Sequence, residues 1–246
     1  MPHIDLSEDL PGILGPMKKY PNTGGLISKL VQEVLRGPSP LEPGQREMIA
    51  AYTSARNDCT FCEGAHSATA GELLRDKALV EQVKAEAAPI SDKMKALLAI
   101  SAKVQEDARD VSDEDVARAR QEGATDKAIH DTVLITAVFS MCNRYVDGLD
   151  TPVPDDKEEY AEHGKALADE GYGLTTHPWL PVFIRPRPRW STRRKGPPRP
   201  VGLRCRLPCR GRVPVGRRAT VAIFHSPPLP CHTLIFQRGF PAFEAH

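Results

Sequence analysis

Residues 47–66, E-M-I-A-A-Y-T-S-A-R-N-D-C-T-F-C-E-G-A-H, decide the predicted fold because they read as two helices joined by a tight turn. A helix is predicted over residues 43–56, where Pro43 suits a first helical position. Asn57 and Asp58 are typical turn residues, and a second helix is predicted over residues 59–74. The segment therefore predicts an antiparallel pair of helices with a short connection.

The sequence on both sides of this hairpin is also helical in pattern. Asp76, Ser91 and Ser112 are suitable helix caps, and Ser112 can form a capping box with Asp115. Residues 1–22 are predicted to be irregular, because four prolines and two glycines interrupt them. No alternating run before residue 174 predicts a strand, so residues 1–174 are predicted to form an all-α domain. The other predicted helices span residues 24–36, 76–87, 91–107, 112–122, 126–149 and 157–170.

The helix predicted over residues 126–149 differs from the others in its pattern. It is apolar on nearly every side between Ile129 and Cys142. A helix of this kind belongs either in the middle of a bundle or in a subunit interface.

Residues 175–246 form a tail with a different composition. Residues 1–174 contain 19 Lys and Arg against 31 Asp and Glu, whereas the tail contains 14 basic residues and one acid, Glu244. The tail also holds 13 of the 23 prolines, so it is not expected to build a packed core. It is disordered, a product of a reading-frame shift in GC-rich DNA, or a basic arm that binds nucleic acid. We expect disorder or a frame shift and do not expect nucleic-acid binding.

Several classes of protein are excluded by the sequence. The longest strongly apolar stretch, residues 133–142, is about half of the roughly 18 residues that a membrane span needs. The first ten residues lack the basic start and apolar core of a secretory signal, so we expect a cytoplasmic protein without membrane contact. Six cysteines are too sparse for a disulfide scaffold, and a close pair then indicates catalysis or metal binding.

Four residues of the hairpin are suited to chemistry on sulfur. Cys59, Cys62 and His66 project from one face of the predicted helix, since their spacings are i, i+3 and i+7. Glu47 is about as far before the turn as His66 is after it, so antiparallel helices bring the two nearly level. A carboxylate beside an imidazole, with two thiols nearby, can move protons to and from sulfur.

This arrangement suits the reduction of peroxides. A thiolate attacks a peroxide, and the N-terminus of a helix lowers the pKa of a cysteine there. His66 can accept the thiol proton while Glu47 orients the imidazole. After the attack the sulfur becomes a sulfenic acid, and a second cysteine three residues away can condense with it to a disulfide. These physical terms leave the order of the two thiols open, because the helix dipole favours Cys59 and proximity to His66 favours Cys62.

The pattern E-x11-C-x2-C-x3-H, filled by Glu47, Cys59, Cys62 and His66, resembles the signature of the AhpD-like alkylhydroperoxidases in the carboxymuconolactone decarboxylase superfamily. N-R-Y-V-D-G-L-D at residues 143–150 and Y-A-E-H-G-K-A-L-A-D-E-G-Y at residues 160–172 resemble its peroxidase-related branch. The resemblance covers about residues 10–173 and does not extend into the tail.

This resemblance implies an AhpD-like helical bundle that assembles as a homotrimer or hexamer. It implies a peroxiredoxin-type activity on hydrogen peroxide or organic hydroperoxides, with no cofactor and no metal. Cys62 is then oxidised to the sulfenic acid, Cys59 donates a proton and closes the disulfide, and Glu47 and His66 relay protons. A lipoyl protein or a thioredoxin-like protein is the expected dithiol reductant. Phe61 stands where well-studied members carry a histidine, so turnover and reductant are expected to differ from theirs.

Alternative interpretations concern both function and individual residues. A lyase of the carboxymuconolactone decarboxylase type on the same fold, and a non-enzymatic binding module that uses the basic tail, are the alternative functions. Cys59, Cys62 and His66 are also possible zinc ligands, with Cys142 or His130 as the fourth, or mere packing residues. Without zinc, Cys142 is expected to be a small core residue, and His130 and His163 are expected to lie at the surface or an interface. Tyr52 and Arg56 are expected either to face the pocket or to pack. The tail gives only a weak metal-binding pattern, formed by Cys205, Cys209, Cys231 and His232.

Overall fold

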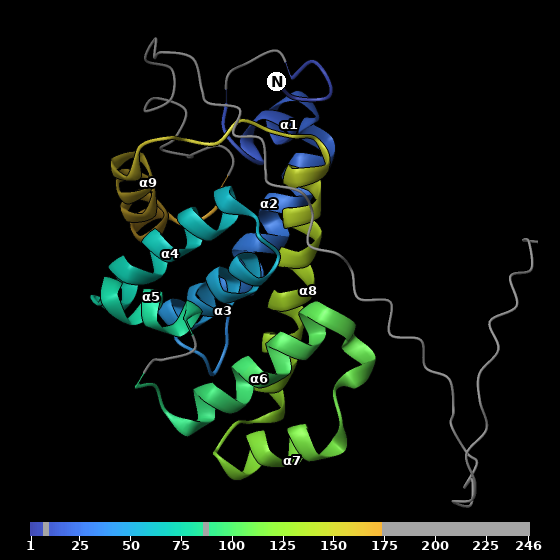
Figure 1. Cartoon of the computed structure of the whole chain (residues 1–246), viewed down its shortest axis with the longest axis vertical. Helices are drawn as coiled ribbons and strands as arrows, with labels where there is room; N and C mark the ends of the chain where they lie inside the picture. Colours follow the sequence, from blue (N-terminus) through green and yellow to red (C-terminus); the bar gives the residue numbers. More distant parts are fainter. Residues whose placement is uncertain (7–9, 86–88, 174–246) are drawn as a thin grey trace, which may run out of the picture. The chain divides into compact units, whose positions relative to one another are not determined.

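Figure 1 shows the computed structural model of the chain, in which residues 1–6, 10–85 and 89–173 are described. Regular structure in these ranges is helical throughout, which confirms the predicted all-α domain. The tail predicted over residues 175–246 lies outside the described residues. Within the described ranges, every helix is too short or too polar to cross a membrane. The helices are α1 (Leu14–Lys19), α2 (Pro21–Arg36), α3 (Pro43–Arg56), α4 (Thr60–Leu74), α5 (Lys77–Lys84), α6 (Asp92–Asp107), the 3-10 turn η1 (Ala108–Asp110), α7 (Asp113–Gln121), α8 (Asp126–Gly148) and α9 (Lys157–Glu170).

The predicted capping residues begin their helices as expected. The side chains of Asp76 and Ser91 accept hydrogen bonds from the backbone three residues further on, at the starts of α5 and α6. Ser112 and Asp115 form the predicted capping box of α7. Each side chain satisfies a backbone N–H group that has no partner within the helix, and this fixes the helix start.

The prediction that residues 1–22 are irregular is wrong, because α1 lies within them and α2 begins at Pro21. Pro16 occupies the first turn of α1 and Pro21 the first position of α2. A proline is tolerated there because the N–H group it lacks would have no partner within the helix. Leu14 and Met17 of α1 are buried, so packing of these side chains also stabilises the helix.

Helices α3 and α4 form the predicted hairpin, and α4 packs between α3 and α9. Asp58 closes the turn in the left-handed region with φ +56°, and Cys59 caps α4. On the other side of α4, a Cβ atom at Gly164 of α9 would lie 2.6 Å from the backbone of Ala68. Glycine at this position therefore allows α9 to approach the helix that carries both cysteines.

The direction of α8 follows from two hydrogen bonds to the ends of α3. Ser39, before α3, donates to Asp131 early in α8 (2.7 Å), and Asn57, after α3, donates to Asn143 late in α8 (2.8 Å). Helix α8 therefore runs parallel to α3. Since α4 returns antiparallel to α3, it is also antiparallel to α8.

Helix α8 buries one face and leaves the other partly exposed. Ile135 and Phe139 are buried in the core, whereas Ala137 is exposed and Met141 is 44% exposed. A position in the middle of the bundle, one of the two predicted for this helix, is therefore wrong for the described domain, because neighbouring helices cover a single face. The other position, a subunit interface within a homotrimer or hexamer, stays a prediction.

Candidate active site

The hairpin brings Glu47 and His66 into direct contact, as the spacing about the turn predicts. The Oε2 atom of Glu47 lies 2.7 Å from Nδ1 of His66. Glu47 is fully buried on α3, and His66 is 6% exposed on α4. A buried carboxylate at this distance accepts a hydrogen bond from the N–H group at Nδ1. This bond fixes the orientation of the imidazole ring and leaves Nε2 to act as a base.

Two residues from outside the hairpin, Arg36 and Tyr172, also contact Glu47. Arg36, the last residue of α2, places Nη2 2.6 Å from Oε1 of Glu47. The hydroxyl of Tyr172 donates to the same Oε1 at 2.8 Å and lies 3.2 Å from Nδ1 of His66. The Arg36 guanidinium also lies over the Tyr172 ring, 5.2 Å from its centroid. Both residues are far from residues 47–66 in sequence, so local spacing does not predict their contacts with Glu47. The one available signal is that Tyr172 ends a segment that resembles the peroxidase-related branch.

The segment after α9 is held in place so that Tyr172 reaches this cluster. Its backbone N–H donates to Oε1 of Gln32 at 2.7 Å, and its carbonyl oxygen accepts from the hydroxyl of Ser28. Gly171 has φ +74°, a conformation that glycine adopts without strain. The end of the described domain is therefore fastened to α2, beside Arg36.

The electrostatics of this cluster keep Glu47 ionised. Burial alone would raise the pKa of Glu47, but the hydrogen bond and charge of His66, the charge of Arg36 and the hydrogen bond from Tyr172 outweigh it, so the pKa is lowered. Burial and the charge of Glu47 raise the pKa of Tyr172 well above its usual value. The tyrosine is therefore a neutral donor and the glutamate an anionic acceptor at neutral pH.

The two cysteines of the motif are buried and free at the start of α4. Cys59 is the N-cap residue, and Cys62 lies in the first turn. A hydrogen bond with Cys59, burial and the charges of Cys59 and Cys142 raise the pKa of the Cys62 thiol well above its usual value, although a hydrogen bond with Asn143 acts in the opposite direction. The Cys62 thiol is therefore protonated at neutral pH, because the paired thiol and burial disfavour the thiolate.

Cys62 and His66 line the same internal cavity, which has a volume of about 50 Å³. Its wall is largely apolar, and α1, α2, α4, α8 and α9 contribute to it. Phe61 also lines it, and the ring of Phe61 packs so closely on Gly12 that a Cβ atom there would lie 2.0 Å away. The lining residues are Ile13, Leu14, Met17, Ile27, Ser28, Val31, Phe61, Cys62, Ala65, His66, Phe139, Cys142, Leu167 and Tyr172.

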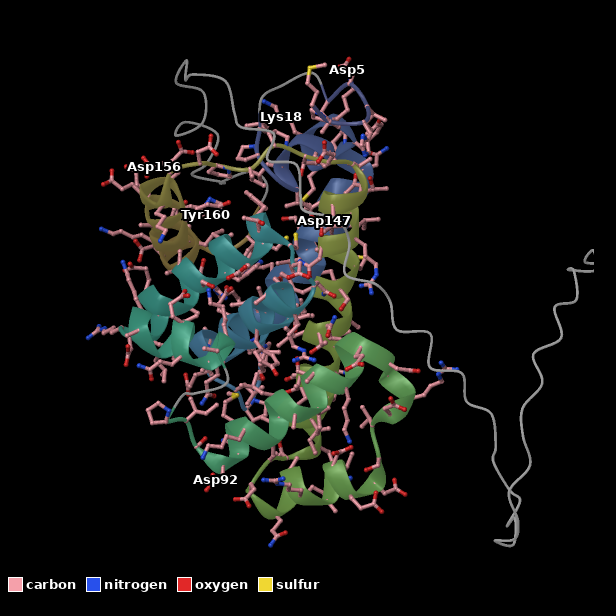
Figure 2. The ribbon with its side chains drawn as sticks, in the orientation of Figure 1. Asp5, Lys18, Asp92, Asp147, Asp156 and Tyr160 are labelled. Carbon is pink, nitrogen blue, oxygen red and sulfur yellow. The ribbon has the colours of Figure 1, made fainter. Side chains whose placement is uncertain are left out.

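Phe61 is enclosed by aromatic side chains on the side of α9. The ring of Tyr160, labelled in Figure 2, lies across Gly64 and 6.3 Å from the Phe61 ring, centroid to centroid. His163 meets Phe61 edge-on, with ring centroids 6.3 Å apart, and is buried. The prediction that His163 lies at the surface or an interface is therefore wrong, because the close packing of α9 on α4 covers it.

The remaining candidate residues lie apart from this cavity, with one exception. Arg56 lies over the Tyr52 ring, 5.6 Å from its centroid, and neither side chain lines the cavity. His130 is exposed, as predicted, and contacts Asp131 at 2.9 Å. Cys142 is buried, as predicted, but it lines the cavity.

The zinc alternative finds no support in the described ranges. No group of three or more His, Cys, Asp or Glu side chains there has an arrangement that could hold a metal ion. His130, one of the two candidates for the fourth ligand, lies outside the cavity that Cys62 and His66 share.

No family model matches the chain, and no curated protein matches it. Solved structures do. An uncharacterized peroxidase-related protein from Silicibacter sp. TM1040 is 25% identical with a TM-score of 0.58, and the match covers 63% of this chain and 80% of that one. An alkylhydroperoxidase AhpD core, an uncharacterized peroxidase-related protein from Ralstonia eutropha JMP134, is 26% identical with the same TM-score, covering 63% and 82%. The chain therefore has an AhpD-like, peroxidase-related fold, as the pattern of residues 47–66 predicts.

Proposed function

We propose that the chain is a thiol-dependent peroxidase that reduces hydroperoxides through a dithiol–disulfide cycle of Cys59 and Cys62. The observation that carries the proposal is the shared cavity of Cys62 and His66, with the imidazole held by the buried carboxylate of Glu47. A thiol, a base and a carboxylate that is hydrogen-bonded to the base are the parts that an activated sulfur nucleophile needs.

Removal of the Cys62 proton is the first step. The raised pKa of Cys62 means that the resting thiol is protonated, so the reaction needs a base beside it. Nδ1 of His66 faces Glu47, which leaves Nε2 as the basic nitrogen. Because Arg36 and Tyr172 also bind Glu47, the carboxylate stays anionic and stabilises the imidazolium that forms.

Attack on the peroxide is the second step. The Cys62 thiolate forms a bond to the terminal peroxide oxygen while the O–O bond breaks, and the leaving alkoxide takes the proton held by His66. The products are an alcohol, or water when the substrate is hydrogen peroxide, and Cys62 sulfenic acid. Asn143, whose side chain hydrogen-bonds to Cys62, supports the thiolate before the attack.

Cys59 closes the cycle. Its thiol condenses with the sulfenic acid of Cys62, so that an S–S bond forms, the S–O bond breaks and water leaves. An external dithiol, from a lipoyl protein or a thioredoxin-like protein, then reduces the disulfide to two thiols. The cavity of about 50 Å³ has room for a small hydroperoxide such as hydrogen peroxide, and its apolar wall favours a short alkyl group over a polar one.

The test is steady-state peroxide consumption by the full chain with dithiothreitol as reductant. We expect Cys62→Ser to abolish turnover and Cys59→Ser to slow it, because the disulfide between Cys59 and Cys62 can no longer form. Cys205→Ser, a cysteine of the tail, is the matched control and should turn over normally. Normal turnover in Cys62→Ser would exclude the proposed cycle.

The role of His66 has its own comparison. Loss of a general base typically costs about 10²–10⁴ in rate, so His66→Ala should lose kcat/KM by that factor. His130→Ala removes an exposed histidine of α8 and should leave kcat/KM unchanged. Equal effects of the two substitutions would remove His66 from the mechanism.

A further inference from the structure

A third thiol, Cys142, borders the cavity in which the proposed chemistry takes place. It lies on α8, is 2% exposed and is free, and it lines the cavity together with Cys62. The cycle of Cys59 and Cys62 makes no use of it. A buried cysteine often serves as a small apolar residue, but one that borders a site of sulfur oxidation can also react there.

The register of α4 and α8 brings Cys142 level with Cys62. The two helices are antiparallel, and the ring of His66 meets the ring of Phe139 edge-on with centroids 4.3 Å apart. Cys62 lies one turn before His66, and Cys142 lies about one turn after Phe139. Because the helices run in opposite directions, these two steps lead to the same side of the aromatic contact, where both thiols border the cavity.

Other contacts agree with this register. The side chain of Asn143, the residue next to Cys142, hydrogen-bonds to Cys62. Burial and the charge of Cys59 raise the pKa of Cys142 to about 12, and the charge of Cys142 helps to raise the pKa of Cys62. Cys142 is therefore protonated at neutral pH and can donate its proton when it reacts.

We propose that Cys142 is a second resolving thiol, which forms a disulfide with the Cys62 sulfenic acid when Cys59 does not. This inference rests on the proposed function. The Cys142 sulfur bonds to the Cys62 sulfur, the S–O bond of the sulfenic acid breaks, and the thiol proton leaves with that oxygen as water. The step needs no oxidant beyond the hydroperoxide already consumed.

The consequence is protection of Cys62 against irreversible oxidation. A sulfenic acid that finds no thiol reacts with a second peroxide to give a sulfinic acid, which dithiols do not reduce. Cys59 forms the N-cap of α4, whereas Cys142 approaches from α8, so one thiol can respond when the other is already modified. Either disulfide returns to two thiols with the same external reductant.

The experiment uses the full chain with Cys205, Cys209 and Cys231 replaced by serine, so that the described cysteines are the only partners. This parent, its Cys59→Ser variant and its Cys59→Ser/Cys142→Ala variant are each treated with an excess of hydrogen peroxide, because formation of a sulfinic acid consumes a second peroxide. Peptide mapping by mass spectrometry without reduction then identifies each disulfide and each sulfinic acid. Circular dichroism checks that every variant is folded, and Cys59→Ser/Cys142→Ser is measured beside the alanine variant in case one of them fails to fold.

We expect a disulfide between Cys59 and Cys62 in the parent and one between Cys62 and Cys142 in Cys59→Ser. In the two double variants that disulfide is lost and Cys62 sulfinic acid replaces it. If the parent forms its disulfide but Cys59→Ser accumulates sulfinic acid as fast as the double variants, the role of Cys142 is overturned and the proposed function stands. If Cys62 of the parent is not oxidised, both are overturned.

Discussion

The substitution Glu47→Gln removes the charge on which the buried cluster is built while keeping the shape of the side chain. Glu47 is fully buried and contacts Arg36, Tyr172 and His66 at 2.6, 2.8 and 2.7 Å. The amide retains one acceptor oxygen, so some hydrogen bonds survive. The guanidinium of Arg36, whose side chain is 13% exposed, loses its carboxylate partner.

The expected cost follows from that unpaired charge. Removing one partner of a buried ion pair costs about 3–5 kcal/mol, and the slight exposure of Arg36 favours about 3 kcal/mol here. Single domains have a free energy of unfolding of about 5–15 kcal/mol, so the loss is large. With a urea slope of about 2 kcal/mol/M, the unfolding midpoint should fall by about 1.5 M.

The assay is urea unfolding followed by circular dichroism at pH 7, with Glu72→Gln as the matched control. Glu72 lies on α4, and its ion pair with Lys77 is partly exposed, so its loss should cost at most about 1 kcal/mol. Arg36→Met combined with Glu47→Gln should cost less than the sum of the single substitutions, by about 1–3 kcal/mol. A loss below about 1 kcal/mol in Glu47→Gln, or strict additivity in the double variant, would refute the ion pair as the stabilising contact.

The pH dependence of stability gives the same argument a second measurement. The folded protein lowers the pKa of Glu47 below its ordinary value of 4.5, so the carboxylate contributes its stabilisation at neutral pH. That contribution is lost as the pH falls below about 4.5 and through the folded pKa. The acid limb of the stability curve should therefore be flatter in Glu47→Gln, and an unchanged limb would contradict the shift.

Three further substitutions test other parts of the site. Tyr172→Phe keeps the ring but removes the hydrogen bond to Glu47, so the free energy of unfolding should fall by about 1.5–3 kcal/mol. The acid limb of the pH–rate profile should shift to higher pH, and a profile identical to that of the parent would exclude a role in the proton relay. Ala65→Met extends a side chain into a cavity of about 50 Å³, so kcat/KM for hydrogen peroxide should fall steeply. Unchanged turnover would mean that the cavity does not hold the substrate. Gly12→Ala places a methyl group against the ring of Phe61 at φ +56°, so thermal unfolding should show a loss of about 1–3 kcal/mol, and unchanged stability would mean that the residues around Gly12 do not pack as described.

Local sequence predicted most of the helices because their signals act over a few residues. The caps Asp76, Ser91 and Ser112 satisfy backbone groups within one turn, and each begins its helix as predicted. The same local logic misread residues 1–22, where Pro16 and Pro21 start helices instead of preventing them. Local patterns left open which role such a proline takes, because burial of the neighbouring apolar residues contributes to the outcome.

The residues of the candidate site also include some that local sequence predicted and some that it did not. Glu47, Cys59, Cys62 and His66 belong to one helical hairpin, so spacing about the turn at residues 57–58 was enough to bring Glu47 and His66 together. The sequence by itself thus determined the all-α class, the hairpin and the contact between carboxylate and imidazole.

Only the tertiary structure decided which distant residues complete the site and in which direction the pKa of Cys62 is shifted. Arg36, Tyr172 and Cys142 come from α2, the segment after α9, and α8, and no spacing relates them to the hairpin. The raised pKa of Cys62 also depends on the packing around it, since burial and neighbouring thiols act through space whereas the helix terminus acts along the chain. Contacts of this kind form when helices pack together. A local sequence pattern predicts where each helix lies in the chain but not which other helices it packs against.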